Sequence, residues 1–446
     1  MILFSKTMLR THTCGELRAK EAGKKVTLTG WVDSLRVQGK ISFLIVRDRE
    51  GITQCFVNPE LTKKIKDLPK ESVVLVEGKV KKRPDNQVKK DISTGEIELE
   101  TTNVEILSRS ETPLPIEIEE ETTTSMDKRI DYRFLDVRRN KIKTIFNIRS
   151  KIYRHTVDFF SNENFVNIQT PKITQSGVES GAEEFKVSYF GKKASLTQSP
   201  QVYKQMMVIS GLERVYEIGP VFRAEKSHTT RHLTEFTGVD FEMGFVKDES
   251  DVMDVIERYM KFLLENINKD CKEELSLLGI KLNVPKKIPR LTMTEVKTLL
   301  KKWGKKLPPD EDLDPEGEKM ISKIIKEKYN SDFVFVTEFP WKVRPFYHMR
   351  PEGKPKITKS FDLIYNGVEI ATGAQREHRL DVLEKQAKEK GINLKKMDFY
   401  RDIFRFGCPP HGGVGFGLDR ITEQLLILPN IREAVLLPRD VERLTP

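Results

Sequence analysis

The sequence lacks the features that would place the protein in a membrane or outside the cell. Its four cysteines, Cys14, Cys55, Cys271 and Cys408, are far apart and form no C-x-x-C pair. This spacing argues against a disulfide framework and a zinc site, and it favours a reducing compartment. No apolar run approaches the roughly 20 residues that a membrane helix needs. The opening MILFSKTMLR is too short and polar for a secretory signal, so we expect a cytoplasmic protein with no membrane contact.

The composition is that of a large globular protein with excess positive charge. A chain of 446 residues has room for two or three domains with a buried core. Its 77 basic residues outnumber its 67 acidic ones, which gives a net charge of +10. A basic balance suits a polyanion such as nucleic acid, because each bound phosphate releases counterions. Charge alone fits a merely soluble basic protein equally well.

Residues 1–107 are rich in short β-forming runs. KKVTLTGWV, KISFLIVRD, GITQCFV, SVVLVEGKV and GEIELETTNVEIL are separated by Gly, Pro, Asn or Asp. Five short strands in this length predict a closed barrel of the oligonucleotide-binding (OB) kind. The basic segment KVKKRPDNQVKK between the last two strands is either a nucleic-acid contact or a solvated turn.

The rest of the chain predicts a connector and one larger domain. Residues 108–140 carry ETPLPIEIEEETTTSM, which has no apolar period and indicates a hinge or linker. Residues 141–446 open with a helical apolar period from Ile142 to Phe160 and contain a mainly helical segment at about 250–330. Strands and helices do not alternate regularly along this domain. We therefore predict an α+β fold, in which helices flank an antiparallel sheet, rather than a doubly wound one.

The stretch FRAEKSHTTRHLTEF, residues 222–236, joins two predicted strands. It places Arg223 and Glu225 at the end of the first strand, and Arg231 and His232 just before the second. An arginine on a rigid strand can grip a phosphate and stabilise charge that develops during transfer. Taken alone, the stretch fits an exposed hairpin with surface ion pairs better, because surface charge is common.

A second signal is GVGFGLDR, residues 413–420, which runs into the apolar helix ITEQLLIL. Alternating glycines are typical of a strand that a ligand or another element approaches closely. Arg420 then lies near a helix start. The glycine pattern is weak by itself, since neither a P-loop nor a Rossmann context surrounds it.

A third signal is SFDLIYNGVEIATG, residues 360–373. Asn366-Gly367 predicts a two-residue hairpin turn, which sets Ile364 opposite Glu369. Asp362 then lies diagonally from Glu369 on one face of the hairpin. Two carboxylates this close, beside bound phosphates, would suit Mg²⁺, a hard ion that prefers oxygen ligands. The alternative is a pair of solvated acids.

Together these stretches resemble a known family. Arg223-Ala224-Glu225 with its loop resembles motif 2 of the class II aminoacyl-tRNA synthetases, and GVGFGLDR resembles motif 3. FVNIQTPKI, residues 165–173, resembles the dimer-forming motif 1 that ends in a proline, here Pro171. QSPQVYKQ, GAQREHR and LPRDVERLTP extend the resemblance over almost the whole chain, to the aspartyl-tRNA synthetases of the archaeal and eukaryotic type.

The resemblance implies a homodimeric enzyme that activates L-aspartate with ATP and Mg²⁺ and transfers it to the 3′ end of tRNA(Asp), with tRNA(Asn) left open. The catalytic residues would be Arg223, Glu369 and Arg420. The ATP-binding residues would be Arg223, Ala224, Glu225, Arg231, His232, Leu233, Glu369, Gly417, Leu418, Asp419 and Arg420. The aspartate-binding residues would be Glu179, Gln201, Lys204, Arg223, Asp240, Thr372 and Arg376. The Mg²⁺ ligands would be Asp362, Glu369 and Thr372, and the anticodon contacts Phe43 and Gln54.

Three positions depart from the family pattern, and three alternatives stay open. Asn164 stands where a glycine is common, Asp419 where many relatives have glutamate, and Thr372 where close relatives have serine. An asparaginyl-tRNA synthetase is the nearest alternative, and Lys204 with Arg376 favours a charged substrate over a neutral one. The others are a tRNA-binding paralogue with an inactive core, and an amide-forming ligase, which would lack the barrel. Phe43 taken alone fits a barrel core better than base stacking.

Overall fold

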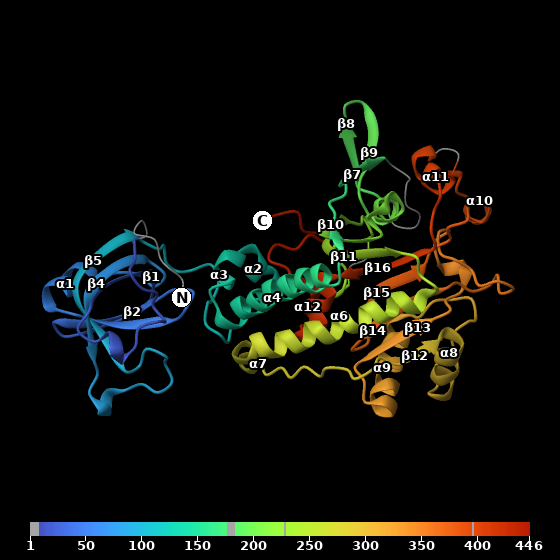
Figure 1. Ribbon diagram of the computed structural model, residues 1–446. Coiled ribbons are helices and arrows are strands. Elements are labelled where there is room, and N and C mark those ends of the chain that lie inside the picture. Colours follow the sequence, from blue (N-terminus) through green and yellow to red (C-terminus); the bar gives the residue numbers. More distant parts are fainter. Residues whose placement is uncertain (1–8, 176–182, 227–228, 395–396) are drawn as a thin grey trace. The chain divides into compact units, whose positions relative to one another are not determined.

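The computed structural model describes residues 9–175, 183–226, 229–394 and 397–446 (Figure 1). The chain divides into two compact units, residues 1–115 and 116–446. All four cysteines are free thiols, as their spacing predicts. Within the described ranges, no helix is long and apolar enough to cross a membrane.

The first unit is a closed five-stranded barrel in the order β1-β2-β3-β5-β4, which confirms the predicted OB-like fold. Inward and outward residues alternate along β2, where Leu44 and Val46 are fully buried. A short helix, α1 (Pro59–Ile65), follows β3 and is capped by the side chain of Asn58. The strands are β1 (Lys25–Gln38), β2 (Ile41–Arg47), β3 (Ile52–Val57), β4 (Val73–Lys82) and β5 (Ile97–Ser108).

The second unit is built on an eight-stranded sheet in the order β12-β13-β14-β15-β16-β11-β10-β6. Only the outermost pairs, β12–β13 and β10–β6, are parallel. This mostly antiparallel sheet with flanking helices confirms the predicted α+β class. Its strands are β6 (Val166–Asn167), β10 (Arg214–Phe222), β11 (Glu235–Gly244), β12 (Arg290–Thr292), β13 (Phe333–Thr337), β14 (Ser360–Tyr365), β15 (Val368–Gln375) and β16 (His411–Gly417).

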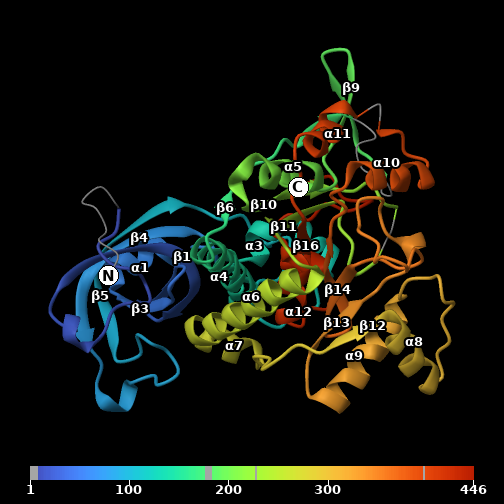
Figure 2. The ribbon, with the colours of Figure 1, turned by 45° about the vertical axis from the view of Figure 1, so that its right-hand side comes forward.

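Long helices cover one face of this sheet and bury the main hydrophobic core. The predicted helical period at the start of the domain forms α4 (Asn140–Asn162), whose Ile148 and Ile152 are fully buried. It lies beside α6 (Glu249–Asp270) in both ribbon views (Figure 2). The same core takes in α7 (Lys272–Leu278) and α12 (Leu418–Leu425). The other face of the sheet is therefore available for polar side chains.

Smaller elements complete the unit. A separate apolar cluster joins α8 (Met293–Lys302) and α9 (Pro315–Tyr329) to β13 and β14. Another joins α5 (Gln201–Met207), α10 (Leu380–Glu389) and α11 (Asp398–Arg405). A three-stranded sheet pairs β9 (Lys192–Leu196) with β7 (Ile173–Gln175) and β8 (Lys186–Tyr189).

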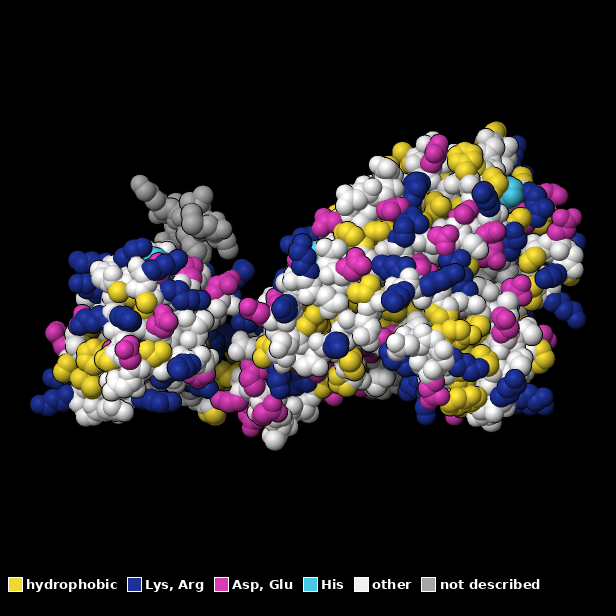
Figure 3. Space-filling view, turned by 60° about the horizontal axis from the view of Figure 1, so that its bottom comes forward, with side chains coloured by type: hydrophobic (Ala, Val, Ile, Leu, Met, Phe, Trp, Pro, Cys, Tyr) yellow, Lys and Arg dark blue, Asp and Glu magenta, His cyan; other side chains and the backbone are white. Residues whose placement is uncertain are grey.

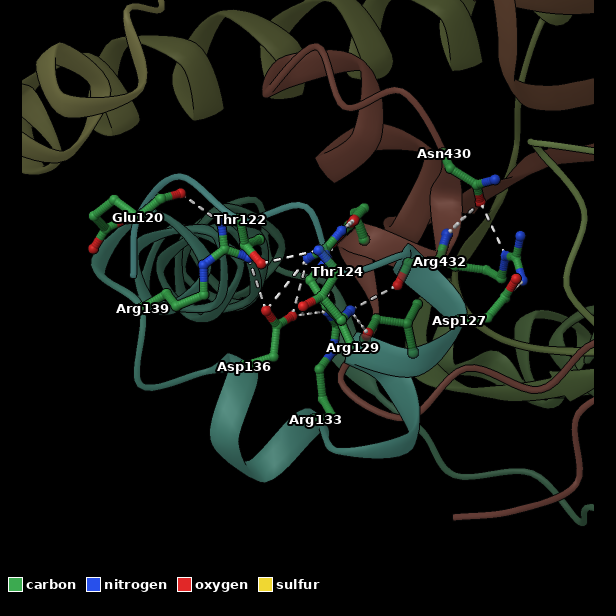
Figure 4. A network of polar contacts seen from close by, with 12 residues as sticks. Glu120, Thr122, Thr124, Asp127, Arg129, Arg133, Asp136, Arg139, Asn430 and Arg432 are labelled. Atoms are coloured by element: carbon green, nitrogen blue, oxygen red, sulfur yellow. Dashed lines mark hydrogen bonds and ion pairs between the residues drawn. The ribbon is translucent and has the colours of Figure 1, made fainter. Parts of the chain in front are cut away.

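The segment predicted as a linker contains two short helices, α2 (Met126–Asp131) and α3 (Arg133–Asp136). Arg129, Arg133 and Arg139 converge on the buried carboxylate of Asp136 (Figure 4). Arg133 also donates to three carbonyl groups near the C-terminus, those of residues 432, 435 and 436. The C-terminal part of the predicted linker thus carries a buried ionic network on the second unit.

Lys and Arg side chains are spread over both units on the face drawn in Figure 3, interspersed with Asp and Glu. This mixture keeps the surface soluble and leaves positive charge available in many places. The net charge therefore does not by itself identify a binding surface, and individual residues have to locate the site.

Candidate active site

The two-residue period of β11 places polar side chains on the face of the sheet that the long helices leave free. Val239 and Phe241 point into the main core. Asp240 and Glu242, the alternating residues, point to the opposite face. The central position of this strand gives both carboxylates a rigid support, and both are buried.

A cavity of about 570 Å³ opens on that face. Its size suits a small-molecule substrate or cofactor. Most predicted site residues line it, namely Gln201, Lys204, Arg223, Glu225, Arg231, His232, Leu233, Asp240, Glu369, Thr372, Arg376, Gly417, Asp419 and Arg420. The tertiary fold thus brings together residues that are separated by more than 200 positions in the sequence.

Among the described residues, three of those predicted for the ATP, aspartate and metal sites are not part of this lining. Ala224 lies beside it and donates its backbone N–H to the Glu183 carbonyl oxygen. Leu418 is fully buried in the main core, and Asp362 lies behind Thr372 on the neighbouring strand. Glu179 falls outside the described residues.

The glycines of β16 make room for the carboxylates of β11. Gly413 is paired with Glu242, and Gly415 with Asp240. A Cβ atom at Gly413 would come within 2.2 Å of Glu242 Oε2 and of a backbone oxygen. One at Gly415 would come within 3.0 Å of Asp240 Oδ1. The close approach predicted from the alternating glycines is therefore confirmed, and the approaching groups are side chains of the next strand.

The site contains a cluster of buried ionisable side chains that we call the buried set: Lys204, Asp240, Glu242, Arg376 and His348. Lys204 Nζ lies 2.8 Å from Asp240 Oδ1 and 3.4 Å from Glu242 Oε2. Arg376 donates from Nε and Nη2 to the two oxygens of Glu242, at 2.8 and 3.2 Å. Although burial opposes ionisation, Arg376 and Lys204 hold the pKa of Glu242 below its usual value. The two predicted cations thus meet on one carboxylate.

The sequence patterns did not predict a role for Glu242 or His348. Arg376 Nη1 donates to His348 Nε2 at 3.0 Å, since a guanidinium cannot accept. Burial and the neighbouring Arg376 lower the pKa of His348 well below its usual value, so the ring is neutral. The period-2 pattern of β11 could have indicated Glu242. No local signal marks His348, because it lies in an irregular loop.

A second group of residues, the open set, is formed by Arg223, Arg231 and Arg420. Their side chains are 44%, 19% and 25% exposed. Arg223 follows the end of β10, where its backbone N–H still bonds to Thr234 and its guanidinium lies over the ring of Phe236. Arg420 lies in the first turn of α12 and donates to the Glu369 carbonyl oxygen at 2.9 Å. These arginines keep most of their donors for a ligand.

The hairpin of β14 and β15 carries the predicted metal ligands. Asn366 and Gly367 have φ of 48° and 84°, and Ile364 faces Glu369, which confirms the predicted turn and register. Beyond this pair a bulge shifts the register, so that Asp362 faces Thr372. Thr372 Oγ1 donates to Glu369 Oε1 at 2.9 Å.

Asp362 is held by a residue absent from the sequence analysis. Arg344 Nη2 lies 2.5 Å from Asp362 Oδ2, while Asp362 Oδ1 has no hydrogen-bond partner in the described chain. Burial raises the pKa of Asp362 to about 8, with Arg344 opposing the shift and Glu369 adding to it. The donor set of two carboxylates and a hydroxyl consists only of oxygen, which fits a hard cation bound mainly by its substrate's phosphates.

Two of the departures from the family pattern have structural explanations. Asn164 has φ of 59°, a left-handed conformation that glycine favours and asparagine tolerates. Asp419 is buried, accepts from Arg149 and from the Thr237 backbone N–H, and so ties the start of α12 to β11. Both replacements preserve the local backbone.

The predicted anticodon contacts lie on the outer surface of the barrel. Phe43 points away from the barrel core and meets Phe56 of β3, with ring centroids 5.9 Å apart. Gln54 accepts from Lys89 Nζ at 3.2 Å and donates to Glu98. Lys89 comes from the basic segment between β4 and β5. An aromatic ring, an amide and a lysine on one surface are typical of single-strand binding.

Two family models match the chain. Residues 26–107 match an OB-fold nucleic acid binding domain, and residues 125–441 match the class II tRNA synthetases of the D, K and N group. Among solved structures, an asparaginyl-tRNA synthetase from Pyrococcus horikoshii with asparaginyl-adenylate has a TM-score of 0.90 at 31% identity, and covers 98% of this chain and 100% of that one. An aspartyl-tRNA synthetase from Entamoeba histolytica has a TM-score of 0.87 at 32% identity, covering 97% and 92%.

Curated relatives agree with these matches. An aspartate–tRNA(Asp) ligase from Pyrococcus abyssi is 42% identical over 445 residues, which are 98% of this chain and 100% of the relative. An aspartate–tRNA(Asp/Asn) ligase from Aeropyrum pernix is 44% identical over 432 residues, 95% and 96% of the two chains. From its OB-fold barrel to its class II core, the chain belongs to the class II aminoacyl-tRNA synthetases, in the family of the archaeal aspartate–tRNA ligases.

Proposed function

We propose that the protein activates L-aspartate with ATP and transfers it to the 3′ end of tRNA(Asp). The observation that carries the choice of amino acid is the meeting of Lys204 and Arg376 on Glu242 at the wall of the cavity. A fixed pair of cations favours a carboxylate side chain, and a site built for a charge rejects the neutral isostere. The full-length relatives named as aspartate–tRNA ligases support the same choice.

The amino acid would bind over the buried set. Lys204 is already surrounded by three acceptors: Asp240, Glu242 and the Val414 carbonyl oxygen. Its contribution is therefore a fixed positive field, while Arg376 keeps donors for the substrate carboxylate. Gln201 adds a buried Nε2 that has no partner within the described chain, and it is suited to a substrate oxygen.

The nucleotide would bind over the open set, with Arg223 at the α-phosphate and Arg420 at the γ-phosphate. The aspartate α-carboxylate attacks the α-phosphate, and pyrophosphate leaves. The terminal tRNA hydroxyl, the 3′-OH, then attacks the carbonyl carbon of the aspartyl-adenylate, so that the ester forms, AMP leaves and the hydroxyl proton is released. The protein supplies no covalent nucleophile, so catalysis rests on positioning and charge stabilisation.

Glu369 and Thr372 would hold Mg²⁺, with Asp362 behind them. The ion would neutralise phosphate charge when bound. The protein's own part is to keep these oxygens oriented, through the Thr372 hydroxyl on Glu369 and Arg344 on Asp362. The first step needs no proton transfer by the protein, because the attacking α-carboxylate is already ionised.

The barrel would bind the anticodon through Phe43 and Gln54.

The chain would act as a homodimer that pairs through the motif 1 segment, where Val166 and Ile173 are 43% and 49% exposed. We expect light scattering to give twice the monomer mass, and a lower mass on changing Val166 to aspartate. A cytoplasmic location stays a prediction.

The decisive experiment is charging of two transcripts, tRNA(Asp) and tRNA(Asn), with labelled aspartate, and with asparagine as the control amino acid. Aspartate on tRNA(Asp) alone indicates a strict anticodon site. Aspartate on both indicates a relaxed site and the need for an amidotransferase that finishes the second product. Asparagine on tRNA(Asn), or no charging at all, would contradict the proposal.

A further inference from the structure

Glu318, in the first turn of α9, contacts Arg231 of the cavity lining although it does not line the cavity itself. Its Oε2 accepts from Arg231 Nη1 at 2.9 Å. The same oxygen accepts from the backbone N–H of Glu369 at 3.1 Å. Glu318 is only 7% exposed and is not among the residues that line the cavity. One buried carboxylate oxygen thus joins the loop after β10 to the strand that carries a predicted metal ligand.

The position of Glu318 is set by rigid packing rather than by the ion pair. Ile321, Ile324 and Ile325 anchor α9 in an apolar cluster with β13 and β14. The hairpin turn at Gly367 packs against the same helix, since a Cβ atom there would lie 3.1 Å from Lys319 Cα. The side chain of Arg231, by contrast, comes from an irregular loop. The helix is therefore the fixed partner, and the arginine is the group that it orients.

The contact forms part of a chain across the open set. Arg231 binds Glu318, Glu318 binds the N–H of Glu369, and the carbonyl oxygen of Glu369 accepts from Arg420. The two outer members, Arg231 and Arg420, are both predicted ATP-binding residues. This contact engages Nη1 of Arg231, and the guanidinium carries further N–H groups that can donate to a polyphosphate.

We propose that Glu318 is a positioning residue for ATP, which orients Arg231 toward the distal phosphates and fixes the backbone of Glu369. This inference rests on the proposed function only in naming ATP as the polyphosphate. It means that the helical segment around α9, which carries no residue of the family motifs, directly affects the nucleotide site.

The test measures ATP binding by calorimetry, so that it does not depend on catalysis. We expect Glu318→Ala to weaken ATP binding about tenfold, the loss typical of one charge-assisted contact, with aspartate binding unchanged. Glu318→Gln retains an oxygen for the Glu369 N–H but loses the charge, and we expect a smaller loss in the same direction. Glu327→Gln, an exposed change on the same helix, is the matched control and should bind ATP as the wild type does.

A double-mutant cycle with Arg231→Ala shows whether Glu318 acts through this arginine. We expect Glu318→Ala to add less than about twofold in that background. The inference would be overturned if Glu318→Ala caused an equal loss of ATP binding in both backgrounds. It would also be overturned if Glu318→Ala bound ATP as tightly as the wild type, or more tightly, with its melting temperature preserved. Wild-type protein that binds ATP but shows no aspartate-dependent pyrophosphate exchange would contradict the proposed function alone.

Discussion

The buried set and the open set lie in one cavity but hold their charges in opposite ways. In the buried set, Lys204 and Arg376 are each 2–3% exposed and are paired with acidic side chains. In the open set, Arg223 is 44% exposed, and the carboxylate of Glu225 is 4.0 Å away. Each cation of the first group lies 2.8 Å from a carboxylate oxygen, whereas Arg420 of the second lies 3.8 Å from Glu369 Oε1.

This difference matches the two kinds of ligand that the proposed reaction needs. A small amino acid is distinguished from its near-isosteres by a pocket whose geometry does not relax, and paired buried ions provide that rigidity. A triphosphate arrives with its own charge and metal ion, so exposed arginines with free donors suffice. Breaking the buried set should therefore affect stability and activity together, whereas changes at Arg223 or Arg420 of the open set should affect activity alone.

The largest effect is expected in the buried set. Lys204→Met or Arg376→Leu leaves a carboxylate without its partner, which costs about 3–5 kcal/mol. We expect aspartate-dependent pyrophosphate exchange to be abolished and the melting temperature to fall, while ATP still binds. Exchange is measured beside Lys193→Met, an exposed control. Retained activation in both variants would remove the role assigned to these cations.

A smaller effect, confined to activity, is expected in the open set. Arg420→Ala removes one positioned donor and should lower the exchange rate by about 10²–10³. Because the side chain is partly exposed, stability should change by less than about 0.5 kcal/mol. Denaturant unfolding checks the second point, with Arg405→Ala as the control. A large loss of stability would mean that the two sets are not distinct.

The same contrast between inward and outward side chains can be tested in the barrel. Phe43→Ala should weaken the tRNA binding on which charging depends by about 1–3 kcal/mol per stacked base. Pyrophosphate exchange should not change. Leu44→Ala, one residue away but in the barrel core, should instead destabilise the protein by about 2–5 kcal/mol. Unchanged tRNA charging in Phe43→Ala would argue against stacking.

The smallest effect concerns Glu423, an acid near the open set. Burial raises its pKa from 4.5 to about 7, although Gln424, Arg420 and Arg231 oppose the shift. Between these values the folded state binds a proton that the unfolded state does not, so stability falls as pH rises through this window. We expect Glu423→Gln to raise the melting temperature by about 2 °C at pH 8. At pH 5 the gain in melting temperature should be smaller. An equal gain at both pH values would contradict the raised pKa of Glu423.

Local patterns in the sequence predicted much of the secondary structure. The helical period gave α4, the β-forming runs gave five barrel strands, and Asn366-Gly367 gave both the turn and the pairing of Ile364 with Glu369. These features depend on neighbours within a few residues, so they survive without tertiary information. The bulge beyond Ile364 was not predicted, because no local residue pattern marks it.

Residue patterns alone were enough to predict the fold class, the family and fourteen of the residues that line the cavity, because motif residues and strand periods are local. The pairing of the charges became clear only in the folded protein. The fold placed Glu242 between Lys204 and Arg376, His348 on Arg376, and Glu318 behind Arg231. These contacts join segments far apart in the chain. Burial makes them strong, and burial is a property of the folded protein rather than of any short stretch.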